Sequence, residues 1–179
     1  MYLLYYIGEK GIVLVDSIKE TGVRSNKALK IKIEVDRQPP LNFSTEEKLL
    51  LRPFSFYVKC FTRSSLFAGK MHALLFRKWL NRVKGSDWYD LEWYIKKGIP
   101  LDVHHFLTRA IDTNDWQDTN ITDEQIIELL AAKIKSVSFS SIKADVVRFI
   151  PNDDVLTIWS PTYFKDLIAQ IKFENTRSK

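Results

Sequence analysis

One segment, residues 64–98, constrains the fold of this chain more than any other, because its apolar side chains recur at helical spacing among dense charges. Its first part is predicted to form a helix that opens with Ser64 or Ser65 as the N-cap and stops before the break at Val83-Lys84-Gly85. The wide apolar face of this helix holds Leu66, Met71, Leu75, Phe76, Trp79 and Leu80. A face this wide has to be buried, so the helix is expected to lie against a core.

The second part of the segment is predicted to be another helix, which starts near Ser86 or Asp87 and ends at Gly98, a residue suited to a left-handed helix terminus. Asp87 and Asp90 fall in its first turn, on one side of the helix. Acids in a first turn stabilise a helix by roughly 0.5–2 kcal/mol without any catalytic role. This pair therefore has an ordinary structural explanation as well as a functional one.

A polar strip is predicted along one side of the first helix. At about 100° per residue, this side holds Lys70, Leu74, Arg77 and Asn81. A solvated surface explains such a strip. The alternative is a polar site, because a cationic strip followed so closely by paired carboxylates is the sharpest polar constellation in the sequence.

The first third of the chain is predicted to form strands at residues 12–15, 29–36 and 53–61, with a loop at residues 42–48. The strand at residues 29–36 alternates cleanly and places Glu34 and Asp36 on its polar face. Two acids at this spacing can both point into a cleft and bind a divalent cation through oxygen. A solvated polar face is the other explanation.

The remainder of the chain is predicted to be helical. Three of its helices are marked by their caps, which are Asp102, Thr122 with Gln125, and Ser160 with Pro161. Another helix is predicted over residues 141–150, and the last is expected to reach about Phe173. The expected fold class is α+β, a small and mostly antiparallel sheet followed by a helical C-terminal half. The sheet region, residues 1–63, and the helical region, residues 64–179, are expected to form one compact domain.

The chain has 179 residues, a formal net charge of +5 and one cysteine, Cys60. A single cysteine excludes an internal disulfide and fits a reducing compartment. The apolar run at residues 2–7 is too short to span a membrane, so we expect a cytoplasmic protein. Four basic residues cluster in the central segment, namely Arg77, Lys78, Arg82 and Lys84. Such a cluster indicates either a polyanionic partner or a solvated basic face.

The central segment also carries a resemblance to a known family. Residues 69–79 and 81–94, which include Lys70, Asp87 and Asp90, are similar to the AbiEii/AbiGii-type nucleotidyltransferase toxins of bacterial type IV toxin–antitoxin systems. The likeness extends upstream to residues 31–36 with Pro39-Pro40, and downstream to residues 144–150 and 158–160. It covers most of the chain.

This resemblance implies a toxin that moves a nucleotide from a nucleoside triphosphate (NTP) onto RNA, which is tRNA in related toxins, and that has a cognate antitoxin. It implies catalytic roles for Lys70, Asp87 and Asp90, and a Mg²⁺ ion bound by Glu34 and Asp36. Contacts to phosphate or to RNA are expected from the basic cluster of Arg77, Lys78, Arg82 and Lys84. The resemblance also implies that residues 1–63 are part of a nucleotidyltransferase-like sheet.

Two features depart from the family pattern. Ser86 stands where the family has an arginine beside the carboxylates, and the Asp-x-Asp pair of the first family motif does not occur in the 179 residues. The chain is therefore expected to be incomplete at its N-terminus, or else to be a non-catalytic relative that binds a partner chain or RNA. On either interpretation the isolated chain is expected to transfer no labelled nucleotide to RNA, and its exposed sheet is expected to self-associate or to bind a missing N-terminal segment.

Overall fold

The computed structural model describes residues 7–8, 11–12, 41–77, 83–150 and 153–175, and the chain falls into two units, Met1–Arg37 and Gln38–Lys179. In the first unit, β1 (Ile7–Gly8) pairs antiparallel with β2 (Gly11–Ile12). The rest of the strand predicted from residue 12, and the whole strand predicted at residues 29–36, lie outside the described residues.

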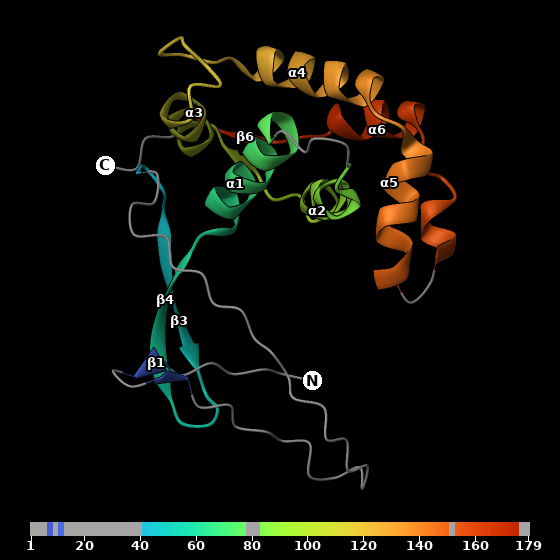
Figure 1. Ribbon diagram of the computed structural model, residues 1–179. Helices are drawn as coiled ribbons and strands as arrows, with labels where there is room; N and C mark the ends of the chain where they lie inside the picture. The colour runs from blue at the N-terminus through green and yellow to red at the C-terminus, as the bar shows by residue number, and fades with distance from the viewer. Residues whose placement is uncertain (1–6, 9–10, 13–40, 78–82, 151–152, 176–179) are drawn as a thin grey trace, which may run out of the picture. The chain divides into compact units, whose positions relative to one another are not determined.

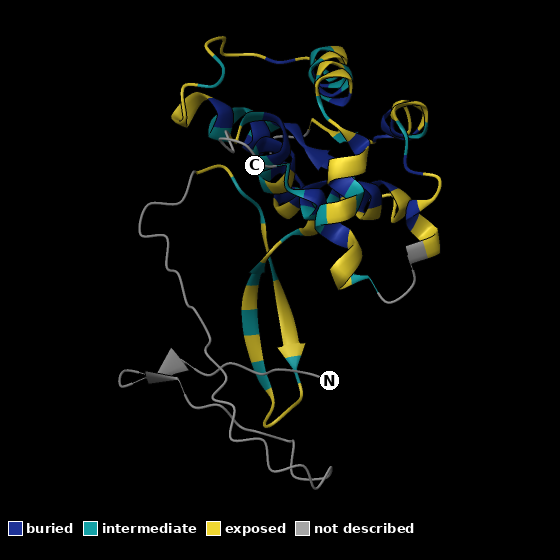
Figure 2. Ribbon diagram, turned by 45° about the vertical axis from the view of Figure 1, so that its right-hand side comes forward, coloured by how far each residue is buried: buried dark blue, intermediate teal, exposed yellow. Residues whose placement is uncertain are grey.

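The second unit begins with a hairpin of β3 (Thr45–Leu50) and β4 (Phe56–Phe61), paired antiparallel (Figure 1). The strand predicted at residues 53–61 is present as β4, whereas the loop predicted at residues 42–48 is wrong from Thr45 onward. The side chains of both strands are exposed or half-buried (Figure 2). Because neither face has to be apolar, a stretch rich in glutamate and lysine forms β3 through its backbone pairing with β4.

The rest of the second unit is mostly helical. The helices are α1 (Arg63–Phe76), α2 (Gly85–Lys96), α3 (Val103–Asp112), α4 (Asp123–Ser136), α5 (Phe139–Val146) and α6 (Pro161–Ile168), with 3₁₀ turns η2 (Val147–Phe149) and η3 (Asp153–Leu156). The expected α+β class is confirmed. Among the helices that the structure describes, none combines the length and the apolar character needed to cross a membrane.

Helix starts match the sequence where the cap is local. Asp102 caps α3, Thr122 and Gln125 form the capping box of α4, and Ser160 caps α6 with Pro161 as its first residue. In each case the capping side chain accepts a backbone N–H from a residue only three positions further on. Local geometry alone therefore specifies these three starts.

Helix starts differ from prediction where a side chain has a distant partner. The N-cap of α1 is Thr62 rather than Ser64 or Ser65, because the Ser65 hydroxyl donates to Asp102 at 2.8 Å and is itself buried. The helix predicted over residues 141–150 starts earlier, since Ser138 is the N-cap of α5.

The last helix ends at Ile168, short of the predicted end near Phe173. Beyond it, β6 (Phe173–Glu174) pairs in parallel with β5 (Leu101–Asp102), and the N–H of Leu101 donates to the Lys172 carbonyl at 2.8 Å. This two-residue pairing joins the C-terminal part of the unit to the segment before α3. Each strand contributes only two residues, and the two strands are far apart in the sequence. No periodic sequence pattern therefore predicts this pairing.

The start of α2 depends on α5. The N–H of Gly85 donates to the Asp145 carboxylate at 2.9 Å, and Lys84 is the N-cap without a capping side chain. The predicted start at Ser86 or Asp87 is therefore late, because the acceptor that caps the helix comes from another element. A Cβ on Gly85 would lie 2.4 Å from the Ile142 carbonyl oxygen, so the two helices meet at a distance that only glycine allows.

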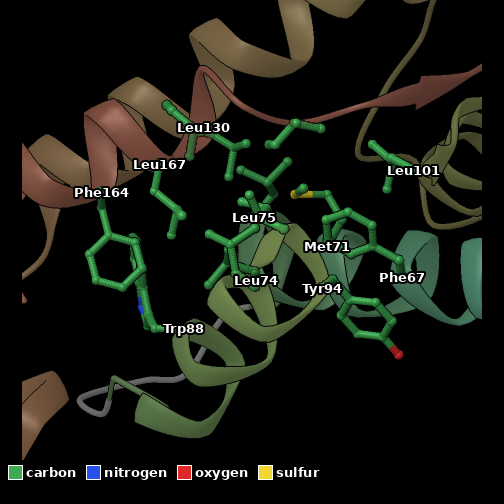
Figure 3. Packing of buried hydrophobic residues seen from close by; sticks show 14 of the residues in the cluster. Phe67, Met71, Leu74, Leu75, Trp88, Tyr94, Leu101, Leu130, Phe164 and Leu167 are labelled. Carbon is green, nitrogen blue, oxygen red and sulfur yellow. The ribbon is translucent and has the colours of Figure 1, made fainter. Parts of the chain in front are cut away.

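The core lies between the helices, and α1 supplies its centre with Phe67, Met71, Leu74 and Leu75 (Figure 3). Phe67 stacks on Tyr94 of α2 with ring centroids 4.6 Å apart, and Trp88 of α2 contacts Phe164 of α6 at 5.1 Å. The buried stripe is rotated from the predicted one. Leu66, expected to be buried, is 45% exposed, and Leu74, expected on the polar strip, is 5% exposed.

A buried carboxylate fixes α2 to the C-terminal part. Oε2 of Glu92 accepts from the Trp159 indole at 3.0 Å, and Oε1 accepts from the Tyr163 hydroxyl. The Nζ of Lys96 lies 2.6 Å from the same Oε1. Because each of these donors meets a charged acceptor, the acid is satisfied although it is only 6% exposed. The opposite side of α2 is left to carry Asp87 and Asp90.

We expect Gly85→Ala to destabilise the protein by about 1–3 kcal/mol, because its Cβ must displace backbone of α5. Gly69→Ala is the matched control within α1. Its Cβ would meet only the Arg109 guanidinium, at 3.9 Å, and it gains helix propensity. Denaturant unfolding of both variants checks the prediction, and equal stability of the two would show that α2 and α5 are not in close contact.

Candidate functional site

A cavity of about 260 Å³, the smaller of two described below, lies beside α1 and is also lined from α2 and α3. Its charged and titratable lining residues are Lys70, Arg77, Lys84, Asp87, His105 and Arg109. Lys70 lies within α1, whereas Arg77 is its extended C-cap residue, so α1 ends earlier than predicted. The structure nevertheless brings Lys70, Arg77 and Asp87 together as predicted, while their functions stay predictions.

Lys70 and Asp90 form an ion pair at the edge of this cavity. The Nζ of Lys70 lies 2.7 Å from Oδ2 of Asp90, with the two side chains 47% and 31% exposed. Burial alone lowers the pKa of the Lys70 ammonium, but the hydrogen bond and charge of Asp90, with the charge of Asp87, outweigh it and raise that pKa above its ordinary value. Lys70 is consequently a permanent cation at neutral pH.

Asp87 lies deeper, at 4% exposure, in the first turn of α2. Asp87 is the third residue of α2, and Asp90 is the sixth, so the prediction that both acids lie in the first turn is wrong for Asp90 because the helix starts earlier than expected. The Nζ of Lys84 lies 3.5 Å from Oδ1 of Asp87. Asp87 therefore lies beside both the Lys84 ammonium and the N-terminal end of α2, where the helix dipole is positive.

Two lining residues come from α3, and Arg109 was not among the predicted site residues. His105 and Arg109 stand at positions i and i+4, so they share one face of the helix. This spacing was the available signal. The Nδ1 of His105 lies 3.0 Å from the Leu41 carbonyl oxygen. Burial lowers the pKa of His105 below its ordinary value, and the charge of Arg109 adds to the effect, so the ring is uncharged at neutral pH.

Asp102 holds α3 against α1. Its Oδ1 accepts the His105 N–H at 2.9 Å and its Oδ2 accepts the Ser65 hydroxyl at 2.8 Å. The N–H of Ser44 donates to the Ser65 oxygen at 2.9 Å, which attaches the segment before β3 to the same group. Lys70 of α1 and Arg109 of α3 owe their shared cavity to this network.

A larger cavity, of about 480 Å³, adjoins the first and shares Ala73, Arg77, Lys84 and Asp87 with it. Its other walls come from the end of α1, from Trp88, and from the loop and helix that contain Asp115, Lys133, Ser136 and Val137. The Nε2 of His72 lies 3.0 Å from the Thr113 hydroxyl and 3.2 Å from Asp115. Burial, with the charge of Arg109, lowers the pKa of His72.

The arrangement suits anions better than metal ions. Among the residues that the structure describes, no group of three or more His, Cys, Asp or Glu side chains is placed to hold a metal. Asp87 and Asp90 each face a lysine, so they do not form an oxygen-rich metal site. Glu34, Asp36, Lys78 and Arg82 lie outside the described residues, and their roles stay predictions.

Comparison with known proteins gives one result. The family model for the nucleotidyl transferase AbiEii toxin of type IV toxin–antitoxin systems matches residues 10–167. No curated protein and no solved structure matches the chain. The matched range contains every residue named above as lining either cavity.

Lys70→Ala is expected to change the free energy of unfolding by less than about 1 kcal/mol, because a half-exposed ion pair contributes little to stability. Trp88→Ala, which deletes a buried aromatic ring of α2, is expected to cost about 3–5 kcal/mol. Chemical denaturation of both variants checks this. Similar losses from both would assign Lys70 a structural role.

Proposed function

The chain belongs to the nucleotidyl transferase AbiEii toxin family of type IV toxin–antitoxin systems, and we propose that it binds the triphosphate of an NTP in the smaller cavity and transfers the nucleotide to RNA. The observation that carries this proposal is the convergence of Lys70, Arg77, Lys84 and Arg109 on that cavity. Cations from separate helices suit a polyphosphate, which presents several charged oxygens at once. The family also implies a cognate antitoxin.

The proposed roles follow from the ion pairs. In nucleotidyl transfer, an acceptor hydroxyl attacks the α-phosphorus, the bond to the bridging oxygen breaks, and pyrophosphate leaves. Negative charge moves toward the leaving group, where fixed cations stabilise it. Lys70 is the phosphate-contacting catalytic residue. Asp90 holds the Lys70 ammonium in place, with Oδ2 and Nζ 2.7 Å apart. Asp87 does the same for the Lys84 ammonium, with Oδ1 and Nζ 3.5 Å apart.

Mg²⁺ is part of the proposal as an ion that supplies further positive charge to phosphate oxygens when bound. Glu34 and Asp36 are its proposed ligands. The carboxylates described by the structure do not fit a metal, so the roles of Lys70, Asp87 and Asp90 are derived without it. Lys78 and Arg82 are proposed to contact the RNA backbone, together with the net charge of +5.

A second candidate function is binding without transfer. The observation that favours it is the absence of an Asp-x-Asp pair from the 179 residues. On this candidate the chain holds an NTP or RNA in the same cationic cavity but cannot activate the acceptor. The family match over residues 10–167 is the reason to place transfer first.

A labelling assay separates the two candidates. The chain is incubated with each α-³²P-labelled NTP, Mg²⁺ and tRNA, and we expect label to appear in the RNA. Lys70→Ala should lower the rate by about 10²-fold, since it removes a cation from the developing charge. Lys165→Ala is the control, because this lysine is exposed on α6 and lines neither cavity.

Retention of NTP without label in the RNA would support the second candidate. Failure to bind any NTP would reject transfer, and failure to bind both NTPs and RNA would reject both candidates. Equal rates for Lys70→Ala and Lys165→Ala would show that the reaction does not use the smaller cavity.

A further inference from the structure

A groove of about 310 Å³ lies where α5 and η2 meet η3 and the residues that follow it (Figure 1). Ala144, Val147 and Leu156 give the groove apolar walls, and Lys143 and Thr157 complete its lining. It shares no residue with the two cavities described above. The proposed nucleotide chemistry therefore leaves this groove without a role.

Hydrogen bonds within the protein hold the two walls of the groove in place. The Nζ of Lys143 on α5 donates to the Thr157 carbonyl on the facing wall, at 3.4 Å. On that facing wall, the N–H of Thr157 donates to the Asp154 carbonyl at 3.0 Å, and the N–H of Trp159 donates to the Leu156 carbonyl at 3.1 Å. The groove is therefore preformed, which lowers the cost of binding into it.

Exposed apolar side chains gather beside this groove, namely Val147, Phe149, Val155 and Ile158. Phe149 projects furthest of the four, since it is 68% exposed although it follows the groove wall by only two residues. The guanidinium of Arg148 lies over its ring, 4.7 Å from the centroid. A group of exposed apolar residues around a groove is typical of a protein contact surface.

The shape of this surface is complementary to itself. It carries both a projecting ring, Phe149, and a groove with apolar walls. In a contact with two-fold symmetry, whatever one copy offers the other copy also offers. Each Phe149 ring can then enter the groove of the other copy, so that one contact fills two grooves.

The charges beside the groove are complementary in the same way. Arg148 belongs to η2 and Asp154 to η3, the elements that form opposite walls of the groove, and both residues are exposed. Two-fold symmetry can bring Arg148 of each copy to Asp154 of the other. A partner with charge of a single sign would match only one of these two residues, whereas a second copy matches both.

We propose that this surface binds a second copy of the chain, in a two-fold symmetric dimer in which Phe149 of each copy occupies the groove of the other. Because the same surface is used on both copies, the contact closes at two chains and does not continue into a filament. The inference is independent of the proposed nucleotide transfer.

Sedimentation velocity of the full chain, over a series of concentrations, tests the proposal. We expect the parent chain to convert from monomer to dimer as its concentration rises. Phe149→Ala should raise the dissociation constant at least about tenfold, because it deletes the ring that fills the groove. Tyr57→Ala is the matched control, since this aromatic residue of β4 is 70% exposed, and it should leave the dissociation constant unchanged.

A charge exchange tests the two-fold geometry. Arg148→Asp and Asp154→Arg should each weaken self-association, because each variant places like charges opposite one another. An equimolar mixture of the two variants should recover dimers, since a mixed dimer contains two pairs of opposite charge. Circular dichroism checks that each variant retains the helix content of the parent chain.

Three results would overturn the proposal. The first is a parent chain that stays monomeric at all concentrations or grows beyond a dimer. The second is a loss of self-association in Tyr57→Ala as large as that in Phe149→Ala, which would assign the contact to the exposed hairpin. The third is a mixture of the charge variants that associates no more tightly than either variant alone.

Discussion

The buried carboxylate of Asp102 is the constraint on which the site depends. It accepts a hydrogen bond from each of two elements, the Ser65 hydroxyl of α1 and the His105 N–H of α3. Because Asp102 is only 9% exposed, losing either donor would leave a buried charge poorly compensated. The helices that carry Lys70 and Arg109 are therefore held in one arrangement before any ligand arrives. A preformed cationic cavity avoids the cost of assembling it during binding.

A second constraint sets the position of α2. Asp145 caps its first N–H, and Gly85 lets α5 approach to a distance that a Cβ would prevent. Lys84 and Asp87 flank this contact, so the same packing that starts the helix also places them beside the cavity. On the opposite side, Glu92 attaches the helix to Trp159 and Tyr163. The charges of the site are thus carried on an element fixed from two sides.

The sequence predicted the features whose interacting residues are close together along the chain, and it missed those whose partners are distant. The caps at Asp102, Thr122 and Ser160 were predictable because each bond closes within one turn. The grouping of Lys70 with Arg77 was predictable from helical spacing. The role of Asp145 was not, since its partner Gly85 is sixty positions away and the contact follows from tertiary packing. A polar stretch that forms β3 was missed because it lacks the alternation of a half-buried strand.

Arg109 shows why the site itself was only partly predictable. Its spacing from His105 suggested a shared helix face, but only the docking of α3 on α1 turns that face toward Lys70. The two cavities share Arg77, Lys84 and Asp87, and both are lined by charged and apolar side chains. On the proposed function, cations that come from separate elements contact several oxygens of one triphosphate at once. Such contacts fix the α-phosphate relative to the attacking hydroxyl, which is the position that transfer requires.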